Sequence, residues 1–286
     1  VRHGDAQILA DRRLASAEFG YRSDTTRFLT SVEDAIGTPD QAGSLSGQLS
    51  EFENSLIEAS SRPDATERLE SSALAARDLA NAINRASDTV QDARSEADRS
   101  IAVQVDRLND ALASVKEVNT KITSAVSQRQ DTAALQDQRQ LLIDEISEMV
   151  PVRVVPRDHG AVALFSTGGA ILLDGSAAEI GFEPANTVTP YMSVEDGTLS
   201  GITINGFAVS TSSGTGRLRG GTIGAQFEIR DELAPDAQRQ LDAVARDLIE
   251  RFEDPTVDPT LTAGQPGLFT DQGAAFDPLT EEGLAS

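Results

Sequence analysis

Hydrophobic residues recur at helical spacing over an unusually long stretch of this chain. There is no proline between Pro63 and Pro151 and no glycine between Gly47 and Gly160, so nothing there is placed to stop a helix. Apolar residues at steps of three and four in this stretch form one seam: Leu79, Ile83, Ala86, Val90, Ala93, Ala97, Ile101, Val105, Leu108, Leu112, Val115, Val118, Ile122 and Ala125. A helix over residues 64–128 would be on the order of 95 Å long, at about 1.5 Å per residue. Because one small core cannot cover that length, the helix must pack along other helices in the manner of a coiled coil, which favours a structural role.

Shorter helical patterns flank this long one. Residues 5–36 carry an approximate apolar face that ends at Gly37-Thr38-Pro39-Asp40, and residues 44–59 carry a second one that ends at a Ser-Ser-Arg-Pro-Asp turn. After a polar gap, residues 133–149 form a further helical pattern, which must end before Pro151. These segments predict helices beside the long one.

The hydrophobic period changes from helical to alternating at Pro151. Short β-branched runs between turn signals predict strands at 152–155, 161–165, 171–173, 180–182, 199–204 and 207–210. Arg157-Asp158-His159-Gly160 and Asn205-Gly206 have the composition of hairpin turns, so the strands are expected to pair antiparallel.

Helical spacing returns after the glycine pair Gly220-Gly221. Two helices are predicted, at 222–233 and 235–252, with Pro235 suited to a first helical turn. From Asp254 onward, Pro, Gly and Thr predict an extended loop. The predicted fold class is therefore α+β: an elongated multi-helix bundle with one very long helix and a small inserted antiparallel β domain. The predicted divisions are a helical rod at 1–150, the β insertion at 151–221, and returning helices with a loop at 222–286.

Composition narrows the classes of function. The 286 residues include 39% apolar ones, enough for a packed core, and carry a net charge of −22, which disfavours nucleic-acid and anionic-membrane partners. No transmembrane run and no cleavable signal-peptide pattern is present. The absence of cysteine excludes disulfides, thiolate nucleophiles and cysteine zinc sites. The chain starts at Val1 without methionine and stops at Ser286, which predicts a fragment of a longer protein.

The two histidines of the chain are candidate reactive groups. Arg2-His3-Gly4 matches the core of the histidine-phosphatase motif, but no strand precedes it, and the only other histidine is His159. Exposed residues at a helix start are the favoured interpretation. His159 has no histidine or cysteine near it in the sequence, so a turn residue is favoured over a metal ligand.

Other motifs also favour structural interpretations. The glycine-rich segment from Gly214 to Gly221 lacks the ending of a phosphate loop and is predicted to be a flexible return to the helices. Asp254, Asp258 and Asp271 lack the ligand rhythm of a calcium loop and are predicted to lie in a solvated loop. No catalytic, cofactor-binding or metal-binding residue is predicted, and no cofactor is expected.

The charged run Asp137-Gln138-Arg139 has two interpretations. Its pattern is that of a partner surface or of the polar face of a helix, and the polar face, with local capping by Asp137 and Gln140, is favoured.

Several segments in order resemble one family. Residues 136–147, QDQRQLLIDEIS, followed by the strand pattern at 152–155, resemble the signature segment of the flagellar hook-associated protein 1 family, FlgK. Residues 220–233, GGTIGAQFEIRDEL, and 241–245, LDAVA, are similar to that family's segments after its β insertion. Residues 13–21 are similar to its early helix, and Gly267-Leu268-Phe269 resembles one of its loops.

The resemblance implies a structural protein of the bacterial flagellum, not an enzyme, that joins hook to filament as a ring of its own copies and is needed for filament assembly. It implies hook protein and the neighbouring hook-filament junction protein as partners, and an extracellular location reached through the flagellar type III export apparatus. An export chaperone would bind a terminal region absent from this sequence, where the family's innermost helices also belong.

One alternative class of function stays open at this point. The long helix would also suit a coiled-coil adaptor or effector of another secretion system, which would use it to bind a partner helix. An enzyme is the least favoured class.

Overall fold

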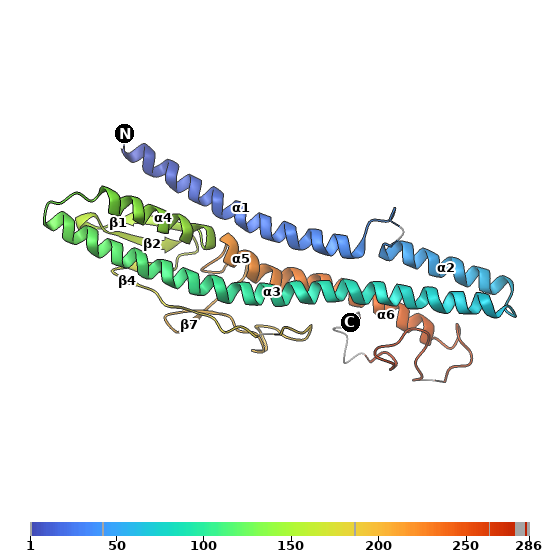
Figure 1. Ribbon diagram of the computed structural model, residues 1–286. Helices are drawn as coiled ribbons and strands as arrows, with labels where there is room; N and C mark the ends of the chain where they lie inside the picture. The colour runs from blue at the N-terminus through green and yellow to red at the C-terminus, as the bar shows by residue number, and fades with distance from the viewer. Residues whose placement is uncertain (1, 42, 186, 263, 278–283, 285–286) are drawn as a thin grey trace. The chain divides into compact units, whose positions relative to one another are not determined.

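A computed structural model describes residues 2–41, 43–185, 187–262, 264–277 and 284, with the side chains at the amino end described from Gln7 onward (Figure 1). The described part of the chain contains helices, two small sheets and loops. In chain order its elements are α1 (Arg2–Ile36), α2 (Leu45–Ser61), α3 (Thr66–Ser127), α4 (Ala133–Met149), β1 (Val152–Pro156), η1 (Asp158–Gly160), β2 (Val162–Ser166), β3 (Ile171–Asp174), β4 (Ser176–Ala177), β5 (Ile180–Gly181), β6 (Ile202–Ile204), β7 (Phe207–Val209), α5 (Gly221–Glu228), η2 (Ile229–Leu233) and α6 (Ala234–Glu253).

The long helix predicted from the hydrophobic seam is present as α3, with 62 residues. Every seam residue named above is buried except Ala93, which is half-buried. The helix therefore derives its stability from packing along one side, as an amphipathic helix of this length requires.

Local chemistry explains where the neighbouring helices begin and end. Ser44 caps α2: its side-chain oxygen accepts a hydrogen bond from the backbone N–H of Gly47 at 3.0 Å. Gly37 ends α1 with a φ of +73°, and a side chain there would collide with Ser44. Helix α4 has the predicted bounds, because Pro151 cannot continue it.

Both sheets are antiparallel, as predicted. One has the strand order β1-β2-β3-β4 and the other β5-β6-β7. The turn between β1 and β2 places His159 and Gly160 at φ values of 54° and 78°, and the turn between β6 and β7 places Asn205 and Gly206 at 53° and 80°. Left-handed conformations of this kind are what the hairpin turn signals predict. The two-residue strand β4 was not predicted, and the strand expected at 199–204 forms only over Ile202–Ile204.

The chain divides into two compact units. Unit 1 comprises residues 1–27, 94–188 and 192–232, and unit 2 comprises residues 28–93, 189–191 and 233–286. Helices α1 and α3 each contribute residues to both units.

One hydrophobic core in unit 1 joins helices and sheets. Ile101 and Leu108 of α3 and Ile146 of α4 belong to the same buried cluster as Leu164 of β2 and Leu172 of β3. In Figure 1, α4, β1 and β2 lie beside this part of α3. The seam of α3 therefore packs against both a neighbouring helix and the strands, because the same buried cluster contains residues of all of them. The division of the chain at residues 151 and 221 stays a prediction.

Polar contacts hold the first part of α1 in unit 1. Arg13 is buried, and its Nε donates a hydrogen bond to Asp144 Oδ1 of α4 at 2.6 Å, while its Nη2 donates to the side-chain oxygen of Gln140. Further along α1, Asp24 Oδ2 accepts a hydrogen bond from Gln226 of α5 at 3.0 Å. This part of α1 is thus positioned largely by hydrogen bonds and ion pairs.

The two returning helices are not separated as predicted. Helix α5 continues through the π-helical segment η2 into α6. Pro235 lacks an N–H and cannot donate to the fourth residue before it, so a wider turn at this point removes the need for that bond.

Unit 2 has an aromatic cluster. Phe52 of α2, Phe252 of α6 and Phe269 of the following loop contact one another, with ring centroids between 5.3 and 5.7 Å apart. A side chain at Gly267 would collide with the carbonyl oxygen of Phe252, which explains the glycine in the Gly267-Leu268-Phe269 motif. The loop from Asp254 is thereby attached to the helices.

Candidate functional site

The most buried charged group in the described residues is Arg230, on η2. Its Nη1 donates to Asp98 Oδ1 of α3 at 2.7 Å and its Nε to Asp231 Oδ1 at 2.7 Å. The guanidinium also lies against the rings of Phe182 and Phe227, at 5.5 and 5.0 Å from their centroids. Cation–π contacts of this kind compensate part of the cost of removing a charge from water.

Neighbouring backbone groups complete this network. The second oxygen of Asp98 accepts a hydrogen bond from the N–H of Ala185 at 2.7 Å. Arg230 Nη2 donates to the carbonyl of Ser200 at 3.0 Å, and Arg94 Nε donates to the carbonyl of Arg230 at 2.8 Å. The network fixes α3, η2 and the loop between β5 and β6 together. The sequence analysis did not predict this network. Arg94 and Asp98 are buried and follow directly after the seam residues Ala93 and Ala97, so a charged residue beside the seam is the signal that could have revealed it.

Arg139 of the signature segment is also internal. Its Nη1 donates to Asn119 Oδ1 of α3 at 2.9 Å and to the carbonyl of Gly160 at 2.7 Å. Burial lowers the pKa of the Arg139 guanidinium from its ordinary value. The expected polar face with local capping is therefore wrong for Arg139, which links α3, α4 and the turn between β1 and β2. Gln140 likewise accepts from Arg13 instead of capping its own helix.

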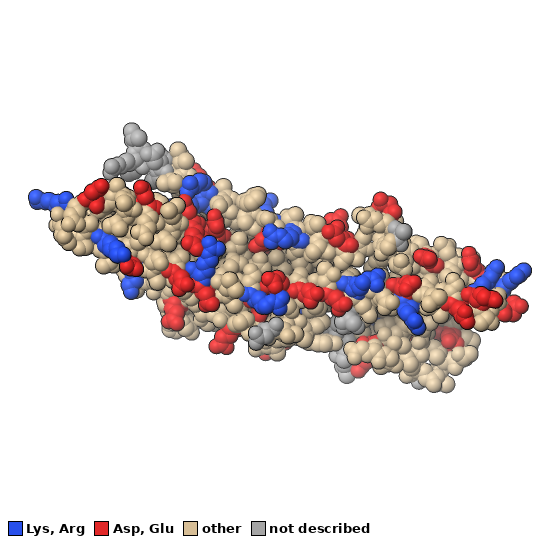
Figure 2. Space-filling model, in the orientation of Figure 1, with Lys and Arg blue, Asp and Glu red and all other residues tan. Residues whose placement is uncertain are grey.

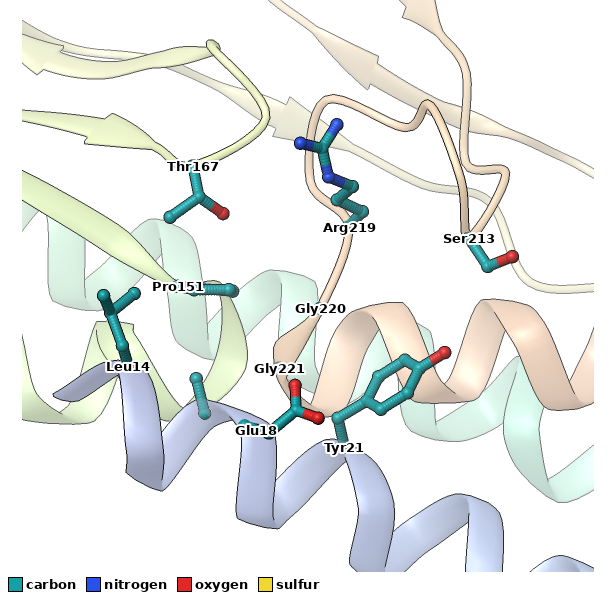
Figure 3. Close-up of a pocket in the computed structure, with 10 residues that line it drawn as sticks. Leu14, Glu18, Tyr21, Pro151, Thr167, Ser213, Arg219, Gly220 and Gly221 are labelled. Atoms are coloured by element: carbon teal, nitrogen blue, oxygen red, sulfur yellow. The ribbon is translucent and has the colours of Figure 1, made fainter. Parts of the chain in front are cut away.

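A pocket of about 520 Å³ lies in unit 1 where α1 passes the start of α5 (Figure 3). Glu18 and Tyr21 of α1 line one side of it, and Thr167, Ser213 and Arg219 come from loops on the other. Among the described residues lining this pocket, none is a histidine, cysteine or lysine that could activate its hydroxyl groups.

The glycine pair beside this pocket is required by geometry. Gly220 and Gly221 have φ values of 78° and 63°. A Cβ at Gly221 would collide with the carbonyl oxygen of Met149, and one at Gly220 would lie 3.0 Å from Pro151 Cγ. The pair lets the chain pass close to the end of α4 before α5 begins.

The segment that leads to this pair is packed, in contrast to the flexible return that was predicted. Leu218 is buried in the core of unit 1, and Ser166 Oγ donates to the carbonyl of Arg217 at 2.6 Å.

Among the residues of this pocket, Tyr21 has a pKa that departs clearly from its ordinary value. Its phenol donates a hydrogen bond to Glu228 of α5. Partial burial raises the pKa of Tyr21 well above its ordinary value, and the hydrogen bond to the Glu228 carboxylate and the negative charges of Glu228, Glu232 and Glu18 raise it further. The neutral phenol therefore links α1 to α5.

None of the remaining sequence candidates is among the described residues that line this pocket. The backbone of Arg2, His3 and Gly4 is in α1, and their side chains lie outside the described part of the structure. His159 is an exposed residue of the turn between β1 and β2, as predicted.

Asp254, Asp258 and Asp271 are the remaining candidate ligands, and all three lie in the loop that follows α6. Asp254 Oδ1 accepts a hydrogen bond from Thr256 N at 2.8 Å, and Asp258 Oδ1 accepts one from Thr260 N at 3.0 Å. The pKa of the Asp254 carboxyl group is lowered mainly by the Thr256 N–H, and that of the Asp258 carboxyl group mainly by the Thr260 hydroxyl, which donates to Asp258 Oδ1 at 2.6 Å, together with the Thr260 N–H. Within the described residues, no group of three His, Cys, Asp or Glu side chains is arranged to hold a metal ion.

The surface carries charges of both signs and several exposed apolar side chains. On the face shown in Figure 2, Lys and Arg side chains are scattered among Asp and Glu. In unit 1 the large exposed apolar residues include Ile8 and Phe19 of α1, Val103 of α3 and Leu141 of α4. None of the helices in the described ranges has the length and hydrophobicity needed to cross a membrane.

Comparison with known proteins identifies relatives of this chain in sequence and in structure. A family model described as the flagellar hook-associated protein FlgK helical domain matches residues 29–267. Flagellar hook-associated protein 1 of Bacillus subtilis (strain 168) is 26% identical over 211 residues, which cover 70% of this chain and 41% of that protein. The structure of the flagellar hook junction protein FlgK from Burkholderia pseudomallei superimposes with a TM-score of 0.66 at 21% identity, over 85% of this chain and 43% of that one.

These likenesses place the chain among the structural components of the bacterial flagellum. The chain belongs to the flagellar hook-associated protein FlgK family, through that family's helical domain. It spans less than half the length of the two relatives described above.

Proposed function

We propose that this protein is a structural component of the junction between the flagellar hook and filament and is needed for filament assembly. The observation that carries the proposal is the match of the FlgK helical domain to residues 29–267. The relative from Burkholderia pseudomallei, which shares the fold, is a flagellar hook junction protein by its own name. We further propose that copies of the protein form a ring that contacts hook protein and the neighbouring junction protein.

The surface of unit 1 supports packing between copies. Helix α3 uses one side for its own core, yet Val103 on another side is 68% exposed, and Phe19 on α1 and Leu141 on α4 are exposed as well. Exposed apolar side chains on several helices gain stability when a neighbouring subunit covers them. A structural subunit of an assembly needs such surfaces.

We also propose that the protein works outside the cell after export through the flagellar type III apparatus. A chain without cysteine reaches its native state without a disulfide, whichever redox conditions it meets. Its fold therefore places no redox requirement on the export step.

The proposal is tested by deleting the gene and examining the cells by electron microscopy. We expect hooks without filaments, and the wild-type gene supplied in trans should restore the filaments. A gene that encodes Leu108→Asp serves as the negative control, because Leu108 is fully buried in the core of unit 1. Antibodies against this chain should label the hook end in complemented cells.

Normal filaments in the deletion strain would overturn the proposal. If the protein is then found in the medium or at another secretion apparatus, the adaptor or effector class takes its place. Secretion of the protein from a strain that lacks the flagellar export apparatus would overturn the export route alone.

A further inference from the structure

Unit 2 contains an open apolar groove that the proposed junction role does not use. The groove has a volume of about 590 Å³ and lies between the last turns of α1 and the first half of α6. Phe28 of α1 and Leu241 of α6 line it and are buried. Leu29 of α1 and Val244 of α6 also line it, but they are 53% and 40% exposed.

The spacing of the lining residues suits a helical occupant. Helix α1 contributes Phe28, Val32 and Ile36. The continuous helix of η2 and α6 contributes Leu233 from η2 and Ala237, Leu241 and Val244 from α6. Both series advance by three or four residues, so each helix presents a continuous apolar edge to the groove. At about 1.5 Å per residue, these edges run for on the order of 12 to 17 Å, the length of two to three helical turns. An amphipathic helix laid between them would bury its apolar stripe.

The charges around the groove define the chemistry of that helix. Among the described residues that line it, the charged ones are Glu33 and Asp236, and both are acidic. Asp236 forms an exposed ion pair with Arg239, and Glu33 is exposed. Over the sequence of unit 2, acidic residues outnumber basic ones roughly three to one. A second copy of this chain would bring the same negative charge, which disfavours it as the occupant.

We propose that this groove binds an amphipathic helix of a different protein, whose apolar stripe is flanked by Lys or Arg. The basic flanks would face Glu33 and Asp236, while the stripe would cover Leu29 and Val244. Complementary charge of this kind selects partners and speeds association, and the apolar contact supplies most of the binding free energy.

The test uses the full 286-residue chain and two fluorescently labelled synthetic helical peptides. Both peptides carry the same leucine stripe, one flanked by lysine and the other by glutamate. Fluorescence anisotropy should show the lysine peptide binding at least about tenfold more tightly than the glutamate peptide. Leu29→Glu and Val244→Glu should each weaken binding of the lysine peptide by at least about tenfold.

Leu74→Glu provides the matched control. Leu74 lies on α3 in unit 2, is 57% exposed and does not line the groove, so this variant should bind the peptide as the wild type does. Circular dichroism should show that all three variants are folded, because substitutions of exposed residues usually change stability little.

Three results would overturn the proposal. Equal binding by wild type and Leu29→Glu would place the peptide elsewhere, and equal binding of both peptides would remove the charge argument. A dimer in sedimentation that dissociates in Leu29→Glu would make a second copy the occupant. Because none of these readouts involves flagellar assembly, the groove and the junction role fail independently.

Discussion

Arg230 and Asp98 form an ion pair at 2.7 Å with both side chains almost completely removed from solvent, at 0% and 1% exposure. The two residues are 132 positions apart in the chain. A buried charge without its partner is very costly. Loss of either residue should therefore destabilise the packing of η2 against α3 in unit 1.

Removing one partner should therefore destabilise the protein strongly. We expect Arg230→Met to lower the free energy of unfolding by about 3 to 5 kcal/mol, because it leaves the Asp98 carboxylate buried and unpaired. Denaturant unfolding followed by circular dichroism measures this loss. The double variant Asp98→Asn/Arg230→Met should lose less than Arg230→Met alone, since no uncompensated charge remains.

A neighbouring surface pair is the control. Arg99 on α3 pairs with Glu96, and both are exposed, so Arg99→Gln should change stability by well under about 1 kcal/mol. Similar losses of unfolding free energy in Arg99→Gln and Arg230→Met would contradict a stabilising role of the buried pair.

The two sides of α3 should respond differently to the same substitution. Leu108→Asp places a charge in the core of unit 1 and should cost about 3 to 5 kcal/mol. Val103→Asp, five positions earlier on an exposed side, should cost less than about 1 kcal/mol. Thermal melting compares the two directly, and comparable losses would mean that the faces of α3 are misassigned.

The glycine pair offers a test of backbone geometry. Gly221→Ala should destabilise by about 2 kcal/mol or more, because the residue has a positive φ and its Cβ would meet the Met149 carbonyl. Gly214→Ala, in the same segment but with free space around it and no positive φ, should be nearly neutral. A Gly221→Ala protein as stable as the wild type would show that the backbone beside the end of α4 can shift to accommodate a side chain.

Tyr21 should titrate at unusually high pH. The chain has two tyrosines, so Tyr191→Phe leaves Tyr21 as the only one to be followed by ultraviolet absorbance. We expect its midpoint well above the ordinary value of 10.0, and Glu228→Gln should move it back toward that value. Since folding raises this pKa, the associated stability is complete below about pH 10 and is lost as the pH rises through the folded-state value. A midpoint near 10.0 in the folded Tyr191→Phe protein would contradict the Tyr21–Glu228 contact.

Removal of the β insertion tests the predicted division of the chain. Replacing residues 151–221 with a Gly/Ser linker would remove Leu164, Leu172 and Ile202 from the core that they share with α3 and α4. We therefore expect loss of cooperative thermal unfolding and exposure of apolar surface that binds a hydrophobic dye. Retained cooperative melting, with loss of strand signal only, would instead establish the insertion as a separate domain.

The sequence predicts the helices of this fold better than their contacts. Helix α3 could be predicted because its seam repeats over many turns without Pro or Gly, and α4 because Pro151 fixes its end. The strand β4 has only two residues, too few for an alternating pattern. The continuity of α5 and α6 was missed because Pro235 is equally compatible with a new helix and with a π-helical turn.

Side-chain partners from distant segments could not be deduced in the same way. Arg139 was expected to belong to a solvated face, but Asn119 and Gly160 approach it from other elements. The apolar groove combines residues of α1 and α6, so no local pattern contains it. By contrast, Gly220, Gly221 and Gly267 stand in the segments that resemble the family, and the structure supplies the steric reason for each.

The attachment of α1 has a consequence for the order of folding. This helix precedes α4 and α5 in the chain, yet Arg13 bonds to a residue of α4 131 positions later and Tyr21 to one of α5 207 positions later. A chain that emerges amino end first, from a ribosome or from a narrow channel, must therefore keep α1 undocked until α5 has appeared. High contact order of this kind slows folding. Although α1 precedes α4 and α5 in the chain, it is thus among the last elements of unit 1 to find its native neighbours.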